Sequence, residues 1–242
     1  MQLVANQQLV KNRVRLGLGF HIAALAVFGL GLALSLQLDP SSRGELPLAS
    51  WGAILFGLVL YTLGQTQLRR WGPRNRQDEQ IGKAIRALDD RYKLYAFLSS
   101  SLPDYILISP AGVQVLIVRR DAGQVACVRD QWKTTGSRLM SFLAPSPGNP
   151  SADADKQLQK VRTILSQSGM QDVPTSSVIV FTNPKVQLRV EGCSATITRD
   201  TKLEDVLRRL AGKGRNVALS AARIRELQKL FDDRLQAAHS WR

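Results

Sequence analysis

Two apolar segments near the N-terminus constrain the possible folds of this chain more than any other feature. Residues 16–38 and 46–68 contain no Asp, Glu, Lys or Arg. A helix rises about 1.5 Å per residue, so each segment of about 23 residues reaches roughly 35 Å, enough to cross a hydrocarbon core of about 30 Å. The sequence therefore predicts a two-helix transmembrane hairpin.

The charges that flank these segments predict their orientation. Basic residues lie before the first segment and after the second, namely Lys11, Arg13, Arg15, Arg69, Arg70, Arg74 and Arg76. Residues 39–45 carry one Arg and two acids. Because short Lys/Arg-rich loops stay in the cytoplasm, we expect a two-pass protein with both termini and the soluble domain cytoplasmic. A cleaved signal peptide is the alternative for the first segment, but its apolar region would be too long.

The rest of the chain is long enough for one domain. We divide the sequence into a basic N-terminus (1–15), the hairpin with its basic flank (16–76) and a cytoplasmic domain (77–242). The net charge is +14. Residues 1–76 hold eight basic and two acidic residues, which leaves +8 for residues 77–242. A basic domain beside a membrane has nucleic acid or the anionic leaflet as candidate partners, and a solvated basic face is equally compatible.

Hydrophobic periodicity in residues 77–242 alternates between helix and strand. Helical spacing predicts helices over 78–89, 155–167, 204–210 and 220–237. β-branched runs predict strands over 92–98, 105–109, 113–118, 124–128, 177–182 and 195–198, with 177–182 as a central strand covered on both faces. Residues 134–150 are rich in Gly, Ser and Pro and are predicted as a loop. The fold class is therefore an α/β sandwich.

Few kinds of catalytic chemistry fit this sequence. It has no nucleophile elbow, phosphate-binding Walker loop or zinc-protease motif. Gly212 begins a Gly-Lys-Gly-Arg-Asn segment that is typical of a turn between helices. The two histidines, His21 and His239, lie in an apolar segment and near the C-terminus, which argues against a His-dependent triad. We interpret Cys127 and Cys193 as buried free thiols, because two cysteines in strand-like contexts support neither a disulfide framework nor a zinc cluster.

One segment resembles a known family. Residues 101–125 read SLPDYILISPAGVQVLIVRRDAGQV, and they are followed by DQW at 130–132, GNP at 148–150, Gln157 or Gln159, and VIVFTNP at 178–184. This order of elements resembles the nuclease-related domain (NERD) family, relatives of the restriction-endonuclease-like PD-(D/E)xK enzymes. The resemblance implies a restriction-endonuclease-like sandwich with a central mixed sheet. In that family an Asp opens one strand and the next strand ends in Glu-x-Lys.

The candidate site follows from this resemblance, and two of its three strand residues depart from the family pattern. Asp104 matches the metal-binding Asp, whereas Ile117 replaces the Glu and Arg119 replaces the Lys. Glu79 could supply the family's helix carboxylate, although alignment on Gly82 would place Lys83 there instead. If Pro110-Ala111 is a two-residue turn, residues whose numbers sum to 221 pair, and Asp104 lies opposite Ile117. A three-residue turn with Gly112 left-handed would shift this register.

These substitutions predict the loss of metal-dependent cleavage. Such nucleases use carboxylates to hold Mg²⁺, Ile117 offers no oxygen, and Arg119 stays protonated. Asp121 has suitable strand parity but lies roughly 13 Å from position 117. We therefore expect no bound metal or cofactor, with Mg²⁺ only if the chain is an active nuclease.

Three functions remain open. We favour a membrane-anchored, NERD-like pseudoenzyme that acts in binding or scaffolding, with Arg119, Arg120 and Lys133 as candidate nucleic-acid contacts. The first alternative is an active nuclease that uses a displaced acid such as Glu79 or Asp121. The second is a protein- or lipid-interaction module at the cytoplasmic membrane face.

Overall fold

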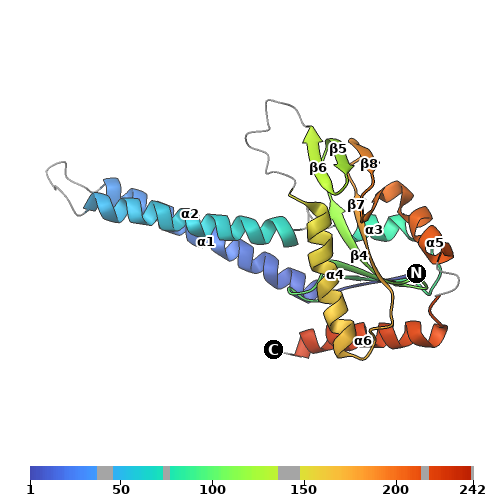
Figure 1. Cartoon of the computed structure of the whole chain (residues 1–242). Coiled ribbons are helices and arrows are strands. Elements are labelled where there is room, and N and C mark those ends of the chain that lie inside the picture. The colour runs from blue at the N-terminus through green and yellow to red at the C-terminus, as the bar shows by residue number, and fades with distance from the viewer. Residues whose placement is uncertain (37–45, 73–76, 136–147, 214–217, 241–242) are drawn as a thin grey trace. The chain divides into compact units, whose positions relative to one another are not determined.

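The computed structural model describes residues 1–36, 46–72, 77–135, 148–213 and 218–240 (Figure 1). The chain divides into two compact units. One unit consists of residues 7–76, and the other combines residues 1–6 with residues 77–242. Of the turn predicted over residues 212–216, Gly212 and Lys213 are helical instead, and residues 214–216 lie outside the described residues, as does the connection 39–45.

The first unit contains two helices, α1 (Gln7–Leu36) and α2 (Leu46–Trp71), which pack antiparallel. A Cβ added to Gly57 would lie 2.6 Å from Phe28, and one added to Gly64 would overlap the ring of His21. The ring of His21 also lies 5.1 Å from that of Tyr61. Glycine therefore allows the close approach of α2 to α1 at these two points.

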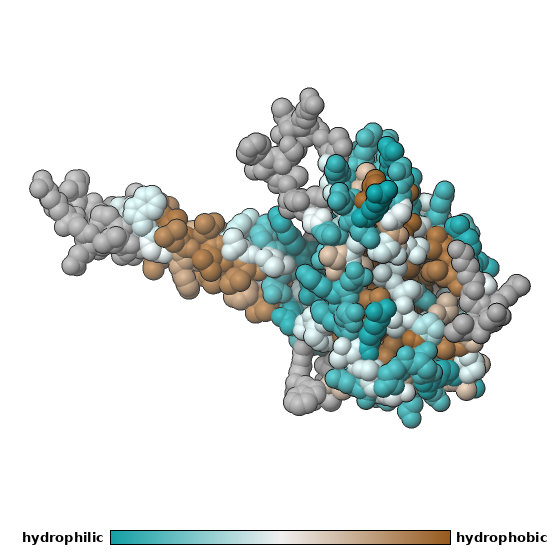
Figure 2. All heavy atoms as spheres, viewed as in Figure 1, coloured by the Kyte–Doolittle hydropathy of each residue, from teal (hydrophilic) through white to brown (hydrophobic). Residues whose placement is uncertain are grey.

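The described part of the chain contains one helix, α1, that is long and apolar enough over Gln7–Ala33 to cross a membrane. Large apolar side chains on both helices are exposed, and Figure 2 shows them as a brown surface. An apolar surface of this kind on a helix is typical of a membrane span.

The second unit is a mixed α/β domain. Its helices are α3 (Asp78–Ala84), α4 (Pro150–Gln167), α5 (Leu203–Lys213), α6 (Ala221–Ser240) and the short η1 (Asp200–Lys202). Its strands are β1 (Gln2–Ala5), β2 (Lys93–Ala96), β3 (Tyr105–Ser109), β4 (Gly112–Arg119), β5 (Gly123–Val128), β6 (Gln131–Thr135), β7 (Thr175–Phe181), β8 (Val186–Glu191) and β9 (Thr196–Arg199).

The central sheet is mixed, as the sequence predicts. Its six strands have the order β1-β2-β3-β4-β7-β9. The β2–β3 and β3–β4 pairs are antiparallel, whereas β1–β2, β4–β7 and β7–β9 are parallel. A smaller sheet has the order β6-β5-β8.

Strand β1 is a feature that the sequence analysis did not predict. It pairs in parallel with β2 at the edge of the central sheet. The amino group of Met1 donates to the carbonyl of Leu88 at 3.1 Å, and Nδ2 of Asn6 donates to the carbonyl of Leu98 at 3.2 Å. The first six residues therefore belong to the α/β domain rather than to a separate N-terminal segment.

The two faces of the central sheet are covered by different helices. On one face, α4 and α6 pack against alternate strand residues such as Ile106, Val113 and Val115. On the other face, α3 lies close to the sheet. A Cβ added to Gly82 of α3 would lie 3.3 Å from the side chain of Leu3 in β1, and Leu3 pairs with Leu94 of β2. Side chains on both faces of β7 are fully buried, which confirms its prediction as a central strand.

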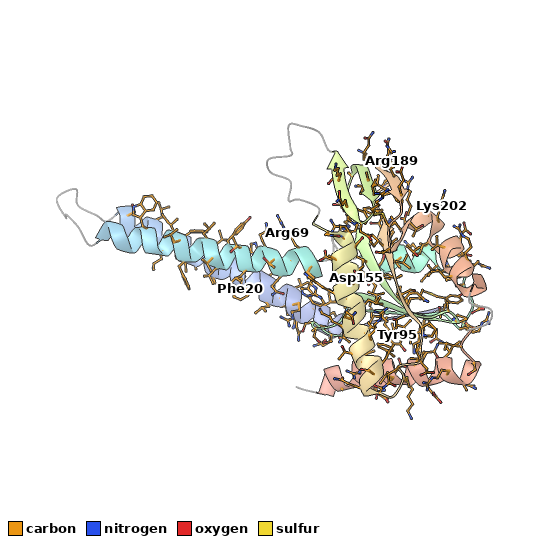
Figure 3. All side chains as sticks on the ribbon, in the orientation of Figure 1. Phe20, Arg69, Tyr95, Asp155, Arg189 and Lys202 are labelled. Carbon is orange, nitrogen blue, oxygen red and sulfur yellow. A yellow bond between two sulfur atoms is a disulfide. The ribbon has the colours of Figure 1, made fainter. Side chains whose placement is uncertain are left out.

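A partly buried ion pair connects α6 to β2. Nζ of Lys93 lies 2.8 Å from Oδ2 of Asp232, and the hydroxyl of Tyr95 donates to Oδ1 of Asp232 at 2.9 Å. Figure 3 labels Tyr95 at this position. Burial, and secondarily the hydrogen bond to Asp232, raise the pKa of Tyr95 well above its usual range, so this hydroxyl stays a donor.

The β3–β4 hairpin has the two-residue turn on which the candidate site depends. Ser109 pairs with Gly112 and Ile106 with Val115, so paired residue numbers sum to 221. Gly112 has φ +109°, and a Cβ there would overlap the carbonyl of Pro174. The two-residue turn and its register are therefore confirmed from Ile106 to Val115, and the three-residue turn is wrong.

Two further strands lie where none was predicted. β6 begins before the predicted loop over 134–150 and overlaps its first two residues; residues 136–147 of that loop lie outside the described residues. β8 follows the Asn-Pro turn after β7. Both strands belong to the smaller sheet, and within the described residues no strand of this sheet pairs with the central sheet.

Candidate functional site

Asp104 and Ile117 lie across from each other where β3 begins and β4 approaches its end. The register of the hairpin, extended by two pairs beyond Ile106 and Val115, places Asp104 opposite Ile117. The carbonyl of Asp104 accepts a hydrogen bond of 2.8 Å from the amide of Phe97. This bond holds the carbonyl of Asp104 in place, and the Asp104 side chain is half-buried at this edge of the sheet.

Ile117 is part of the hydrophobic core. It packs against the cluster beneath α4 and α6, and also against a second cluster that includes Val125, Ile179 and Phe181. Its strand partner on β7 is Ile179, which is fully buried. An apolar side chain at this position joins two parts of the core, which explains the residue without reference to catalysis.

Arg119 forms an ion pair with Asp121. Its Nε lies 2.8 Å from Oδ2 of Asp121, and its terminal nitrogen lies 3.4 Å from Oδ1. Both side chains are about three-quarters buried, with 21% and 26% of their surface exposed. Asp121 thus directs both carboxylate oxygens toward a guanidinium, which makes it a poor ligand for a cation.

The carboxyl ends of β4 and β7 are joined at the same edge. The amide and the hydroxyl of Thr182 both donate to the carbonyl of Arg119, at 2.9 and 3.1 Å. Nδ2 of Asn183 donates to the carbonyl of Arg120 at 3.0 Å. These bonds fix the backbone that carries the two arginines.

Helix α3 also lies at this edge. Nε2 of Gln80 donates to the carbonyl of Thr182 at 3.1 Å and to Oδ2 of Asp200 at 2.5 Å, and the amide of Gln77 donates to the hydroxyl of Tyr105. Glu79 is exposed on this helix. The structure therefore brings the elements that carry Asp104, Ile117, Arg119 and Glu79 to one edge of the sheet.

The candidate nucleic-acid contacts do not gather on one element. Arg119 and Arg120 lie at the end of β4, whereas Lys133 lies on β6 in the smaller sheet, where it pairs with Ala126. Among the residues that the structure describes, neither Asp104, Asp121 nor Glu79 belongs to a group of three potential ligands close enough to share a metal ion.

A polar network that the sequence analysis did not predict surrounds Asp130. Its Oδ1 accepts hydrogen bonds from the amide and the hydroxyl of Ser194 at 3.0 Å and from Oγ of Ser151 at 2.9 Å. Oγ of Ser151 accepts from Nε1 of Trp132 at 2.9 Å. The amide of Ser194, followed by Ser151, lowers the pKa of Asp130, so its charged form joins the β5–β6 hairpin, α4 and the β8–β9 connection.

The interpretation of the cysteines as free thiols is wrong. Cys127 and Cys193 form a disulfide with a Cα–Cα distance of 6.4 Å, and Cys193 is half-buried rather than buried. The parallel pairing of β5 with β8 places Cys127 opposite Val190, three residues before Cys193. Asp130 lies close to both cysteines, but the disulfide leaves neither of them as a thiolate that could bind a metal ion.

The sequence analysis did not identify the residues whose hydrogen bonds connect α3, β4 and β7 at the edge of the sheet that carries Arg119. Gln80 and Asp200 belong to elements that lie far apart in the sequence and meet only through the tertiary fold. Thr182 falls within the segment that resembles the NERD family, but its bond to Arg119 depends on the parallel β4–β7 pairing. A pattern within one segment does not reveal such contacts.

No protein-family model, curated protein or solved structure matches this chain.

Proposed function

We propose that this protein is a membrane-anchored, NERD-like domain of the restriction-endonuclease-like class that has lost metal-dependent cleavage and binds nucleic acid as a scaffold. The proposal rests on the residue resemblance, and the mixed sheet with the expected β3–β4 register is consistent with it. The single observation that carries the loss of activity is the position of Ile117. An apolar core residue stands opposite Asp104, where the family has a metal-binding carboxylate.

A displaced acid is a weaker explanation. Asp121, the acid nearest to Arg119 in sequence, is paired with that arginine, and Glu79 is exposed on α3. A divalent cation bound by one strand carboxylate would lack the oxygen ligands that Mg²⁺ requires. Nuclease activity through Asp121 would therefore need a rearrangement of the Arg119–Asp121 pair.

The chain connectivity supports a two-pass topology. The chain leaves the α/β domain after Asn6 and returns to it at Gln77, and α1 and α2 lie between these points. If α1 crosses a membrane, α2 must cross back, because β1 and α3 belong to the same folded domain. The membrane anchor is thus an insertion in the domain rather than an N-terminal extension.

We place the domain in the cytoplasm. Seven Lys and Arg residues flank the apolar segments on the side of the domain, and such residues favour the cytoplasmic side. The Cys127–Cys193 disulfide favours the opposite side, because disulfides persist mainly in oxidising compartments. We give the flanking charges more weight, since they act during insertion.

Fluorescence anisotropy of a labelled DNA oligonucleotide tests the binding function on the full chain in detergent micelles. We expect binding at low salt that weakens steeply as salt rises, because Lys and Arg would release counterions from the phosphates. The double variant Arg120→Gln/Lys133→Gln should bind more weakly than a matched control, Arg225→Gln/Lys229→Gln on α6. If both variants lose the same DNA affinity, binding depends only on total charge and not on Arg120 and Lys133. If the unmodified chain does not bind DNA at low salt, the proposed nucleic-acid function is wrong.

A further inference from the structure

A cleft lies between α4, α6 and the connection from β2 to β3. Its volume is about 430 Å³, within the range of clefts that hold small ligands. Its apolar wall includes Leu98, Leu102 and Ile164, which belong to the core beneath both helices. None of Asp104, Ile117, Arg119 and Glu79 lines it, so this cleft is separate from the candidate site described above.

Two cations line the cleft, Lys160 from α4 and Arg234 from α6. Among the described residues, no acidic side chain lines the cleft, and neither cation forms a hydrogen bond or an ion pair. The nearest acid in sequence on the inner face of α6, Asp232, is already bound to Lys93 and Tyr95. Two like charges thus share one concave site without a counter-charge.

The guanidinium of Arg234 carries a buried donor. Its Nε is inaccessible to solvent and has no hydrogen-bond partner in the described part of the chain. Buried polar atoms are almost always hydrogen-bonded, so an unpaired donor in a cleft points to a missing partner. Hydroxyl groups of Ser101 and Thr163 lie in the same lining and can donate to or accept from a ligand.

We propose that this cleft binds a small molecule that carries a phosphate group and an apolar part. A phosphate offers several acceptor oxygens to the guanidinium and ammonium groups and neutralises both charges, and charge-assisted hydrogen bonds of this kind are strong. The leucine and isoleucine side chains accommodate the apolar part. A phosphorylated metabolite and a lipid headgroup present the same chemistry, and the experiment separates them.

The test measures binding of inorganic phosphate and of pyrophosphate to the full chain in nonionic detergent, by isothermal titration and by the shift in unfolding temperature. We expect saturable, near-stoichiometric binding that is weakened at least tenfold in Lys160→Gln/Arg234→Gln. The control Lys156→Gln/Arg225→Gln removes the same charge from exposed positions on the same two helices and should bind as the unmodified chain does. If the double variant does not fold, the single variant Lys160→Gln replaces it in the test, because Lys160 is exposed. This variant should bind phosphate and pyrophosphate more weakly than the unmodified chain.

Added phosphatidylglycerol identifies the source of the phosphate. If it displaces pyrophosphate from the unmodified chain, the ligand is a lipid headgroup; if it does not, the ligand is a soluble phosphorylated molecule. Equal loss of binding in the cleft and control variants would overturn the proposal, because binding would then follow total charge. Absence of saturable binding by the unmodified chain would also overturn it. Displacement only by an oligonucleotide would assign the cleft to the nucleic-acid function instead.

Discussion

Ile117 provides the most informative perturbation, because the same position is a core residue in this chain and a metal ligand in the family that it resembles. Truncating a buried isoleucine costs about 2–5 kcal/mol. Ile117 is half-buried and packs against both core clusters, so Ile117→Ala should cost about 2 kcal/mol, the lower end of that range. A charged side chain there should cost more, since a buried carboxylate also loses hydration.

The double variant Ile117→Glu/Arg119→Lys restores the residue types of the family and adds a test of metal binding. The new carboxylate would lie opposite Asp104, with Cβ atoms about 4.5–5.5 Å apart, close enough to share one cation. At a metal concentration a hundredfold above the dissociation constant, metal binding raises the free energy of unfolding by about 2.7 kcal/mol. For a domain of this size that corresponds to about 5–10 °C in unfolding temperature.

Thermal unfolding of the full chain in detergent, with and without Mg²⁺, measures this effect. The control Ile117→Gln/Arg119→Lys has the same size without the charge, and it should be destabilised without responding to Mg²⁺. Adding Asp104→Ala to the glutamate variant should abolish the response. If Mg²⁺ stabilises the glutamate variant no more than the glutamine variant, then Ile117 is a core residue with no relation to a metal site, and the resemblance is architectural only.

Three further predictions concern the domain and its anchor. Replacing residues 7–76 by a flexible linker should give a soluble, folded domain, whereas residues 77–242 alone should unfold at lower urea concentration, because the edge of β2 loses β1. The variant Asp130→Asn should lose less stability in acid than the unmodified chain. Because the pKa of Asp130 is lowered in the folded state, its carboxylate contributes fully to the free energy of unfolding above the unfolded-state pKa of about 4. This contribution disappears as the pH falls through the folded-state pKa. A protease added to inverted membrane vesicles should cleave the domain, and the same protease added to right-side-out vesicles should leave it intact; the reverse pattern would place the domain and its disulfide on the oxidising side.

Local patterns predicted most of the elements of the α/β domain. The β-branched runs at 105–109 and 177–182 correspond closely to β3 and β7, and the Pro-Ala turn gave the observed register. These predictions succeeded because they depend on residues close in sequence. β1 and β8 were missed, and their partners, β2 and β5, come from distant parts of the chain.

The candidate site was predicted less completely than the fold. The sequence identified Asp104, Ile117 and Arg119, and the register places the first two opposite each other, but it did not reveal that Asp121 would pair with Arg119. The disulfide was missed for the same physical reason as β8. Cys127 and Cys193 are 66 residues apart and come together only through the β5–β8 pairing, which no local pattern predicts.

Incubation of the full chain with DNA and Mg²⁺, with the DNA length followed over time, tests the loss of cleavage most directly. Our account predicts that DNA stays intact, because Ile117 supplies no ligand opposite Asp104 and Arg119 places a permanent positive charge nearby. Cleavage that requires Mg²⁺ and disappears in Asp104→Ala would contradict the account and show that the protein is an active nuclease.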